Sequence, residues 1–332
     1  MKRGHGVPMN QGHILDAFKR ISGLVQHTPI SFSPSLSKLN DDPVYLKLEH
    51  LQTTGSFKLR GATNAVISLN DEQKARGVVG VSTGNHGRGL AYAAKQAGVR
   101  CIVCMSSLVP LNKVEGIKAH GAEVRIVGNS QDDAQVEVER LVEEDGMTML
   151  PPFDHPDIIA GQGTLGIEML EQFPEVETVL VPLSGGGLIS GIALAIKSKK
   201  PEVKVIGISM SQGAAMIESQ KAGFPVQVEE VPSLADSLGG GIGMENCYTF
   251  KMVQKLVDEL IMVEEEEIER AVHHAYWKER QVIEGGAAVG IAALLSGRIL
   301  KPGLCLVLLS GGNIDMRLHK RLIDEPGTTA ND

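Results

Sequence analysis

The sequence predicts an α/β fold in which mostly parallel strands are covered by helices on both faces. Short runs rich in β-branched residues recur along the chain, and each is followed by a helix-like segment, which is the pattern of a parallel sheet. Glycine is abundant, at 38 of 332 residues, and it gathers in turns after predicted strands. The rhythm breaks at Pro151 and Pro152, because two prolines cannot continue a helix. A chain of this length tends to form two domains.

The predicted elements alternate from one end of the chain to the other. Strands are expected at residues 44–48, 78–82, 99–105, 124–127, 178–182, 204–210 and 304–310. Helices are expected at residues 57–69, 89–97, 113–120, 134–144, 189–197, 214–223 and 288–298. The glycine-rich stretch 229–245 predicts an irregular loop. The acidic run 264–267 is expected to open a helix that extends to residue 281, since carboxylates favour the positive end of the helix dipole.

The composition excludes several classes of protein. A net charge of −8 and an aromatic content of 4% argue against a nucleic-acid partner, which needs a basic face or stacking platforms. No run approaches the ~20 apolar residues of a membrane helix, and no apolar segment follows the basic start. With only four cysteines, we expect a cytoplasmic protein with no membrane partner. Cys101 and Cys104 form a C-x-x-C, but residues i and i+3 of a strand point to opposite faces, which favours a structural role for both thiols.

Three glycine-rich turns follow predicted strands, at residues 81–89, 182–191 and 309–315. Ligands of open α/β sheets bind where the carboxyl ends of strands lead into helices. In the second turn, the consecutive glycines 185–187 free several backbone N–H groups to converge on one anion. The next glycine, Gly191, comes one residue too late for a dinucleotide fingerprint, and the chain has no Gly-Lys-Ser/Thr tripeptide. These turns predict a phosphate-bearing cofactor that is neither a dinucleotide nor ATP.

Lys58 is the candidate for covalent chemistry. It lies in the first turn of the helix predicted at 57–69, where the helix dipole disfavours a cation. Taken alone, a solvated lysine is the simpler interpretation. Beside a phosphate-bearing cofactor, the same placement lowers the pKa of the amine toward the neutral range, as a Schiff-base lysine requires.

Five motifs, in order along the chain, resemble those of the fold type II pyridoxal-phosphate enzymes, in the serine/threonine dehydratase and serine racemase branch. They are Ser56-Phe57-Lys58-Leu59-Arg60-Gly61-Ala62, the turn at 82–86, Ala160-Gly161-Gln162-Gly163-Thr164, the glycine turn at 184–188 and Ser310-Gly311-Gly312-Asn313. The resemblance covers roughly residues 15–320. It implies two open, mostly parallel twisted sheets with the cofactor between two domains. Residues 1–76 and 151–332 would form the large cofactor-binding domain, and residues 77–150 the small domain.

The resemblance also implies residue roles around pyridoxal 5′-phosphate. Lys58 would bind the cofactor covalently and act as the catalytic base, and Thr83 would be a second catalytic group on the opposite face. The other cofactor-binding residues would be Phe57, Asn85, Ser184, Gly185, Gly186, Gly187, Leu188 and Ser310. Those that hold the substrate carboxylate would be Ser82, Thr83, Asn85 and His86. Ser310 would face the pyridine nitrogen, where a neutral hydroxyl favours elimination over transamination.

Several positions depart from the family pattern. Ser184 stands where the phosphate loop commonly has its first glycine. The racemase branch binds a divalent cation through two carboxylates, and the aligned positions here are Ser209 and Ala215. Because hard cations need carboxylate oxygens, we expect no metal site. The alternative is a site rebuilt from Glu218 or Glu229.

Two features point to a substrate other than plain threonine. Arg88 stands where a glutamine is common, and the loop at 235–243 is unusually rich in glycine. Both suit a larger or more polar substrate, such as a hydroxyaspartate, and both resemble the hydroxyectoine-utilisation dehydratases of the same family. The alternative is that Arg88 faces solvent on the outer side of its helix.

The resemblance therefore implies a dehydratase, or ammonia-lyase, that acts on a small β-hydroxy amino acid as a homodimer or homotetramer. The substrate would be threonine- or serine-like, hydroxyaspartate-like or derived from hydroxyectoine. The alternative is an amino acid racemase with dehydration as a side reaction. It needs an acid at Thr83, where the racemase branch has a serine. A cofactor-binding scaffold without activity is disfavoured by the reactive side chains of Lys58, Asn85 and Ser310.

Overall fold

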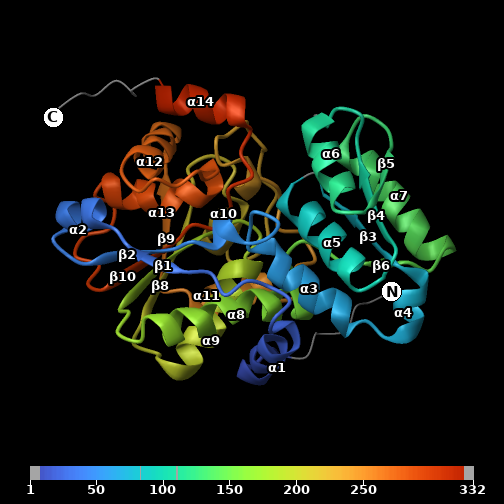
Figure 1. The fold of residues 1–332 in the computed structure, drawn as a ribbon, viewed down its shortest axis with the longest axis horizontal. Helices are drawn as coiled ribbons and strands as arrows, with labels where there is room; N and C mark the ends of the chain where they lie inside the picture. Colours follow the sequence, from blue (N-terminus) through green and yellow to red (C-terminus); the bar gives the residue numbers. More distant parts are fainter. Residues whose placement is uncertain (1–7, 83, 110, 325–332) are drawn as a thin grey trace.

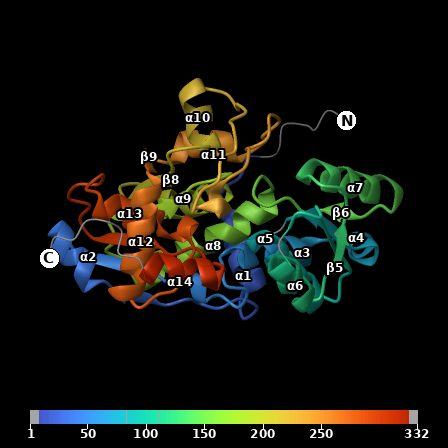
Figure 2. The ribbon, with the colours of Figure 1, turned by 90° about the horizontal axis from the view of Figure 1, so that it is seen from above.

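The protein contains two separate sheets (Figures 1 and 2). The computed structural model describes residues 8–82, 84–109 and 111–324. The larger sheet has the strand order β1-β2-β10-β7-β8-β9, and all neighbours are parallel except β1 and β2. Its strands are Ile30–Phe32 (β1), Val44–Lys47 (β2), Thr178–Pro182 (β7), Lys204–Met210 (β8), Glu259–Val263 (β9) and Cys305–Leu308 (β10).

Helices cover both faces of the larger sheet, as predicted. On one face, apolar side chains of the sheet pack with those of α8 (Pro156–Gln172), α9 (Gly187–Lys199), α10 (Ala215–Ala222) and α11 (Thr249–Leu256). On the other face they pack with α2 (Pro34–Asn40), α12 (Glu265–Trp277), α13 (Gly285–Leu295) and α14 (Met316–Asp324). The helix α1 (Gln11–Ile21) lies on the outer side of α8. The strands are therefore buried from both sides, which explains their continuous apolar sequences.

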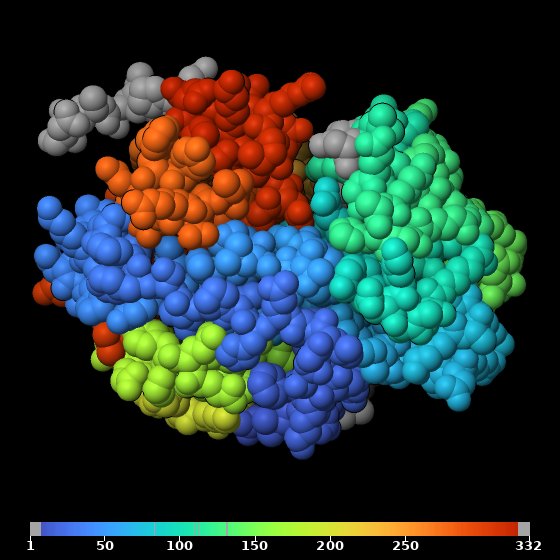
Figure 3. Space-filling model, in the orientation of Figure 1, coloured from blue at the N-terminus to red at the C-terminus, as the bar shows by residue number. Residues whose placement is uncertain are grey.

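The smaller sheet is wholly parallel, with the order β5-β4-β3-β6. Its strands are Val78–Val81 (β3), Cys101–Met105 (β4), Glu123–Ile126 (β5) and Thr148–Met149 (β6). One face packs against α3 (Lys58–Ser68), α5 (Asn85–Gln96) and α6 (Leu111–Ala119), and the other against α7 (Gln131–Glu144). A short helix, α4 (Asp71–Arg76), leads into β3. In Figure 3 this part of the chain forms the teal and green lobe at one side.

The two cysteines of the C-x-x-C lie on opposite faces of β4, as predicted. Cys101 packs in the core beside α5, whereas Cys104 packs in the core beside α7. Both thiols are free, and burial raises the pKa of Cys101 to about 12 and that of Cys104 to about 11. Neither thiol has the thiolate character that redox or metal chemistry requires.

Every strand and helix predicted from the sequence is present, with shifts of a few residues at the ends. The sequence analysis missed the short or edge strands β1, β6 and β9 and the helices α1, α2, α4, α8, α11 and α14. The domain limits at 76/77 and 150/151 stay a prediction. Apolar residues of α3, before the first limit, pack in the core of the smaller sheet. Within the described residues, no helix combines the length and the apolar run that crossing a lipid bilayer requires.

Candidate active site

The predicted site residues meet at one pocket of about 270 Å³. Its lining includes turns from both sheets, at the carboxyl ends of β3, β7 and β10. The predicted residues in this lining are Phe57, Lys58, Ser82, Asn85, His86, Ser184, Gly185, Gly186, Gly187, Leu188 and Ser310. Thr83 lies outside the described residues. The topology thus brings together motifs as far apart in the sequence as those of Phe57 and Ser310.

Lys58 begins α3, and the backbone before it is fixed to the end of β10. The Phe57 N–H donates to the Ser310 carbonyl at 3.0 Å, and Ser56 forms a bridge with Gly311. The Lys58 amine donates to the Pro152 carbonyl at 2.7 Å and lies 5.3 Å from the centre of the Phe57 ring. Desolvation lowers the pKa of this amine to about 8, although the charge of Glu284 acts in the opposite direction. Roughly a tenth of Lys58 is therefore a neutral nucleophile at pH 7, far more than for an ordinary lysine.

The helix that carries Lys58 crosses α8 with the two backbones in close contact at Gly161, and the Gln162 side chain lies beside Gly61. A methyl group at Gly161 would lie 2.6 Å from the Gly61 Cα and 2.7 Å from the Arg60 carbonyl oxygen. Glycine is therefore required at this crossing.

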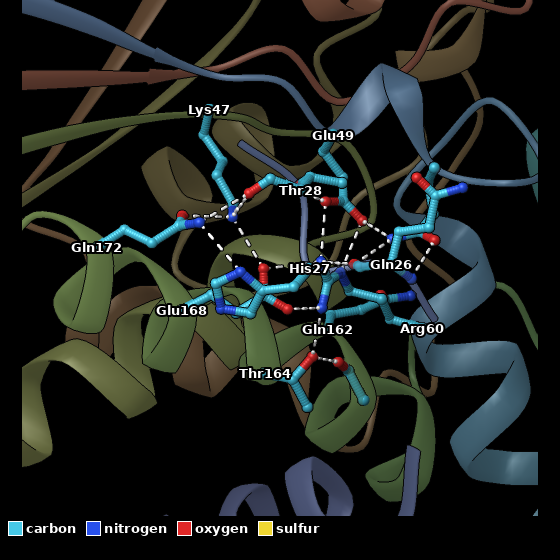
Figure 4. A network of polar contacts seen from close by, with 12 residues as sticks. Gln26, His27, Thr28, Lys47, Glu49, Arg60, Gln162, Thr164, Glu168 and Gln172 are labelled. Carbon is cyan, nitrogen blue, oxygen red and sulfur yellow. Dashed lines mark hydrogen bonds and ion pairs between the residues drawn. The ribbon is translucent and has the colours of Figure 1, made fainter. Parts of the chain in front are cut away.

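A buried cluster of four charges also fixes α3 (Figure 4). It consists of Lys47 at the end of β2, Glu49 in the short 3₁₀ helix η1 (Glu49–Leu51), Arg60 in α3 and Glu168 in α8. Arg60 contacts both carboxylates, with its Nε 2.6 Å from Glu49 and its nearer guanidinium nitrogen 2.5 Å from Glu168. Lys47 lies 2.8 Å from Glu168. The formal charges cancel, which is the condition for burying them together.

The glycine turn after β7 forms a backbone cradle. Gly186 has a φ of +86° and caps the N-terminus of α9. A methyl group at Gly186 would also lie 2.8 Å from Met216 and 3.0 Å from Thr249. This left-handed turn directs unpaired N–H groups of the helix start toward one point, an arrangement that binds anions.

Asn85 belongs to a hydrogen-bond network at the wall of the pocket. Its side-chain N–H donates to Glu284 at 2.7 Å, and its oxygen accepts a hydrogen bond from Asn313, also at 2.7 Å. Glu284 additionally accepts from the Asn313 backbone N–H at 3.2 Å. Burial raises the pKa of Glu284, although its hydrogen bonds oppose the shift. The network fixes the Asn85 amide and leaves one of its two N–H bonds available.

His86 is a neutral side chain in this pocket. Its Nε2 lies 2.8 Å from the Leu150 carbonyl, so Nε2 carries the proton. Burial lowers the His86 pKa to about 3, and the Lys58 charge adds to that effect. The other ring nitrogen, Nδ1, is a buried acceptor with no partner among the described residues. Such an acceptor suits a ligand that supplies a donor.

Comparison with known proteins agrees with this geometry. Residues 21–311 match the family described as pyridoxal-phosphate dependent enzyme. The chain belongs to this family. It is 58% identical over 309 residues to a putative threonine dehydratase of Sinorhizobium fredii, with 93% of each chain covered. It is 41% identical to an L-threonine ammonia-lyase of Thermotoga maritima, covering 94% of this chain and 77% of that one. The structure of maize serine racemase superposes with a TM-score of 0.89 at 32% identity, over 95% of this chain and 98% of that one.

The pocket of this family member fits pyridoxal 5′-phosphate. The glycine cradle is shaped for its phosphate, Lys58 offers a desolvated amine, and Ser310, in the turn after β10, lines the same pocket. When bound, the cofactor supplies an electron-withdrawing ring that stabilises negative charge at the substrate Cα.

The sequence analysis gave no role to two residues of the pyridoxal-phosphate site. Asn313 stands in the third glycine turn, but the two acceptors of its side-chain N–H groups, Asn85 and Thr54, lie 228 and 259 residues away along the chain. Glu284 follows no predicted strand and has no local motif. Its signal is a carboxylate at the start of an apolar helix, and that position alone indicates a helix cap.

Proposed function

We propose that this protein is a pyridoxal-phosphate-dependent dehydratase that converts a β-hydroxy-α-amino acid into a 2-oxo acid and ammonia. The observation that carries the proposal is the desolvated Lys58 amine in the same pocket as the glycine cradle. The relatives from Sinorhizobium fredii and Thermotoga maritima support the reaction class. The substrate would be threonine- or serine-like, hydroxyaspartate-like or derived from hydroxyectoine.

The residues of the pocket divide the work of this reaction. Lys58 would hold the cofactor, and its amine would accept the proton that leaves the substrate Cα. The glycine cradle, with Ser184 and Leu188, binds the cofactor phosphate. Phe57 packs beside the cofactor ring, and Asn85 donates its remaining N–H to the ring oxygen. Ser310 would face the ring nitrogen of the bound cofactor, where a neutral hydroxyl would not force protonation, and this would limit electron withdrawal and favour loss of the β-hydroxyl.

The substrate carboxylate would bind at the turn between β3 and α5. Ser82, Thr83, Asn85 and His86 contribute, largely through backbone N–H groups at the start of α5. His86 stays neutral, so its side chain does not neutralise the carboxylate, and the residue would contribute through its backbone N–H.

An amino acid racemase is the second candidate, because the maize serine racemase shares the fold at 32% identity. Racemisation needs a proton donor on the face opposite Lys58, and the motif offers only Thr83. Solvent deuterium at Cα of both enantiomers of recovered substrate would support a racemase. Dehydration without inverted substrate would exclude it.

The Lys58→Ala variant tests the proposed function. We expect the wild-type protein, purified with pyridoxal 5′-phosphate, to show a cofactor absorbance band and to release 2-oxo acid from a panel of β-hydroxy amino acids. Lys58→Ala should lose the wild-type band and the turnover. Lys74→Ala, on the exposed helix α4, is the matched control. Unchanged turnover in Lys58→Ala would refute the assignment.

A further inference from the structure

One cation of the pocket has no ion-pair partner among the residues that the structure describes. Arg88 lies on α5, one turn after Asn85, and lines the pocket as a half-buried side chain. Its guanidinium packs over Gly116 of α6, where a methyl group would lie 2.6 Å from a guanidinium nitrogen. Its hydrogen bond is to the side-chain oxygen of Asn313, at 3.4 Å. The guanidinium is therefore held on the pocket side of its helix, rather than on the solvent side.

The other charges that line the pocket are already engaged. Lys113 of α6 pairs with Asp236 at 3.3 Å. Lys58 is reserved for the cofactor, and Glu284 accepts hydrogen bonds from Asn85 and Asn313. Among the residues that the structure describes, no carboxylate forms an ion pair with Arg88. Burial lowers the Arg88 pKa, although the Glu284 charge opposes this. A partly desolvated, unpaired guanidinium is unfavourable until an anion joins it.

Two anions of the proposed reaction have other places to bind. The cofactor phosphate suits the glycine cradle after β7, and the substrate α-carboxylate suits the turn before α5. A third anion is needed to explain Arg88. The planar guanidinium fork matches a carboxylate through two parallel hydrogen bonds, which a lysine could not offer.

We propose that Arg88 selects substrates that carry a second carboxylate at the far end of the side chain, as a 3-hydroxyaspartate does. This inference rests on the proposed dehydratase function and narrows its substrate class. Arg88 is a specificity residue in this account. It does not touch the bonds that break, so its effect lies in the preference between substrates.

The first test compares 3-hydroxyaspartate, as both diastereomers, with threonine. We expect the wild-type holoenzyme to have a higher kcat/KM for one diastereomer of 3-hydroxyaspartate than for threonine. Arg88→Gln should lower the ratio of kcat/KM for that diastereomer to kcat/KM for threonine by roughly 10- to 100-fold, which is the range for a hydrogen-bonded charge pair. Arg88→Lys should recover part of the ratio. Arg100→Gln, which removes an arginine from the surface pair with Glu123, is the matched control and should leave the ratio unchanged.

A second measurement needs no turnover. Calorimetric titration of the holoenzyme with succinate and with butyrate compares two ligands of equal chain length that differ by one carboxylate. We expect tighter binding of succinate, and a loss of that preference in Arg88→Gln. If Arg88→Gln lowered the affinities for succinate and butyrate equally, or lowered kcat/KM equally for 3-hydroxyaspartate and threonine, Arg88 would lie at the α-carboxylate and the proposal would be overturned. So would a wild-type preference for threonine. If no substrate releases ammonia while the succinate preference persists, the proposed reaction fails and the second-carboxylate site stands.

Discussion

Removing Arg60 should destabilise the protein far more than removing any surface arginine. In Arg60→Met, the buried carboxylates of Glu49 and Glu168 lose the guanidinium that contacts both. Only Lys47 and neutral donors then remain near them. Leaving a buried charge without its partner costs about 3–5 kcal/mol, a large fraction of the ~5–15 kcal/mol that stabilises a typical protein.

The cluster supplies its own comparisons. Lys47→Met should cost less than Arg60→Met, because Glu168 keeps two hydrogen bonds from Arg60, at 2.5 and 3.0 Å. Arg100→Met, at an exposed pair, should change the free energy of unfolding by about 1 kcal/mol or less. The double variant Arg60→Met/Glu168→Gln should cost less than the sum of its single variants, since the second change removes a stranded charge.

Urea unfolding followed by circular dichroism measures these differences without adding salt.

The contribution of Glu168 to the free energy of unfolding should depend on pH in one direction. Burial alone would raise the Glu168 pKa, but Arg60 and Lys47 outweigh it and the pKa is lowered. A lowered native pKa stabilises the folded state above the unfolded value of about 4.3, and the stabilisation is lost as the pH falls through the native pKa. The difference in the free energy of unfolding between wild type and Arg60→Met should therefore become smaller in acid. A gap within 1 kcal/mol at pH 7, equal to that of Arg100→Met, would refute the reasoning.

Three further predictions concern the pocket. In the cofactor-free protein, acylation of Lys58 followed by mass spectrometry should accelerate as the pH rises through about 8, because the neutral amine reacts; a midpoint near 10.5 would contradict its desolvation. Gly186→Ala should weaken binding of pyridoxal 5′-phosphate about tenfold or more, measured by equilibrium titration, because φ is +86° there and a side chain strains that left-handed conformation. Gly241 has open space around it and no positive φ, so Gly241→Ala should bind the cofactor as wild type does. Equal cofactor affinities of the two variants would contradict a role for the Gly186 turn in phosphate binding. Turnover should survive exhaustive EDTA treatment, since Ser209 and Ala215 supply no carboxylate; loss on chelation and recovery with Mg²⁺ or Ca²⁺ would reveal a cation site elsewhere.

The elements of this fold that depend on a local sequence pattern could be predicted from the sequence. Strands β7 and β8 have the predicted bounds, because every residue in them except Lys204 is buried and burial on both faces favours a largely apolar run. The edge strand β1 has only three residues, two of them exposed, so it leaves no such run. The helix α8 was missed because the small residues of 160–166 resemble a turn, although they pack closely against α3 and α9.

The residues of the candidate site also differ in whether a local sequence pattern predicts them. Lys58, the glycine cradle and Ser310 are visible in short motifs because backbone conformation and local dipoles define their chemistry. Glu284 acts on Asn85 across 199 residues of chain, and Arg60 meets Glu168 across 108 residues. Such contacts depend on topology, which a single sequence does not display.

The backbone crossing of α3 and α8 matters for anyone who wishes to redirect this enzyme. At Gly161 an added methyl group would meet backbone atoms of Gly61 and Arg60, and at Gly61 it would meet the Ile158 carbonyl and the Gln162 side chain, so a substitution at either position would shift the helix that carries Lys58. Random mutagenesis there would yield inactive clones that reveal nothing about substrate choice. Libraries aimed at new substrates should leave this crossing intact and vary Arg88 and the loop at 236–239, which line the pocket from rims that can be repacked.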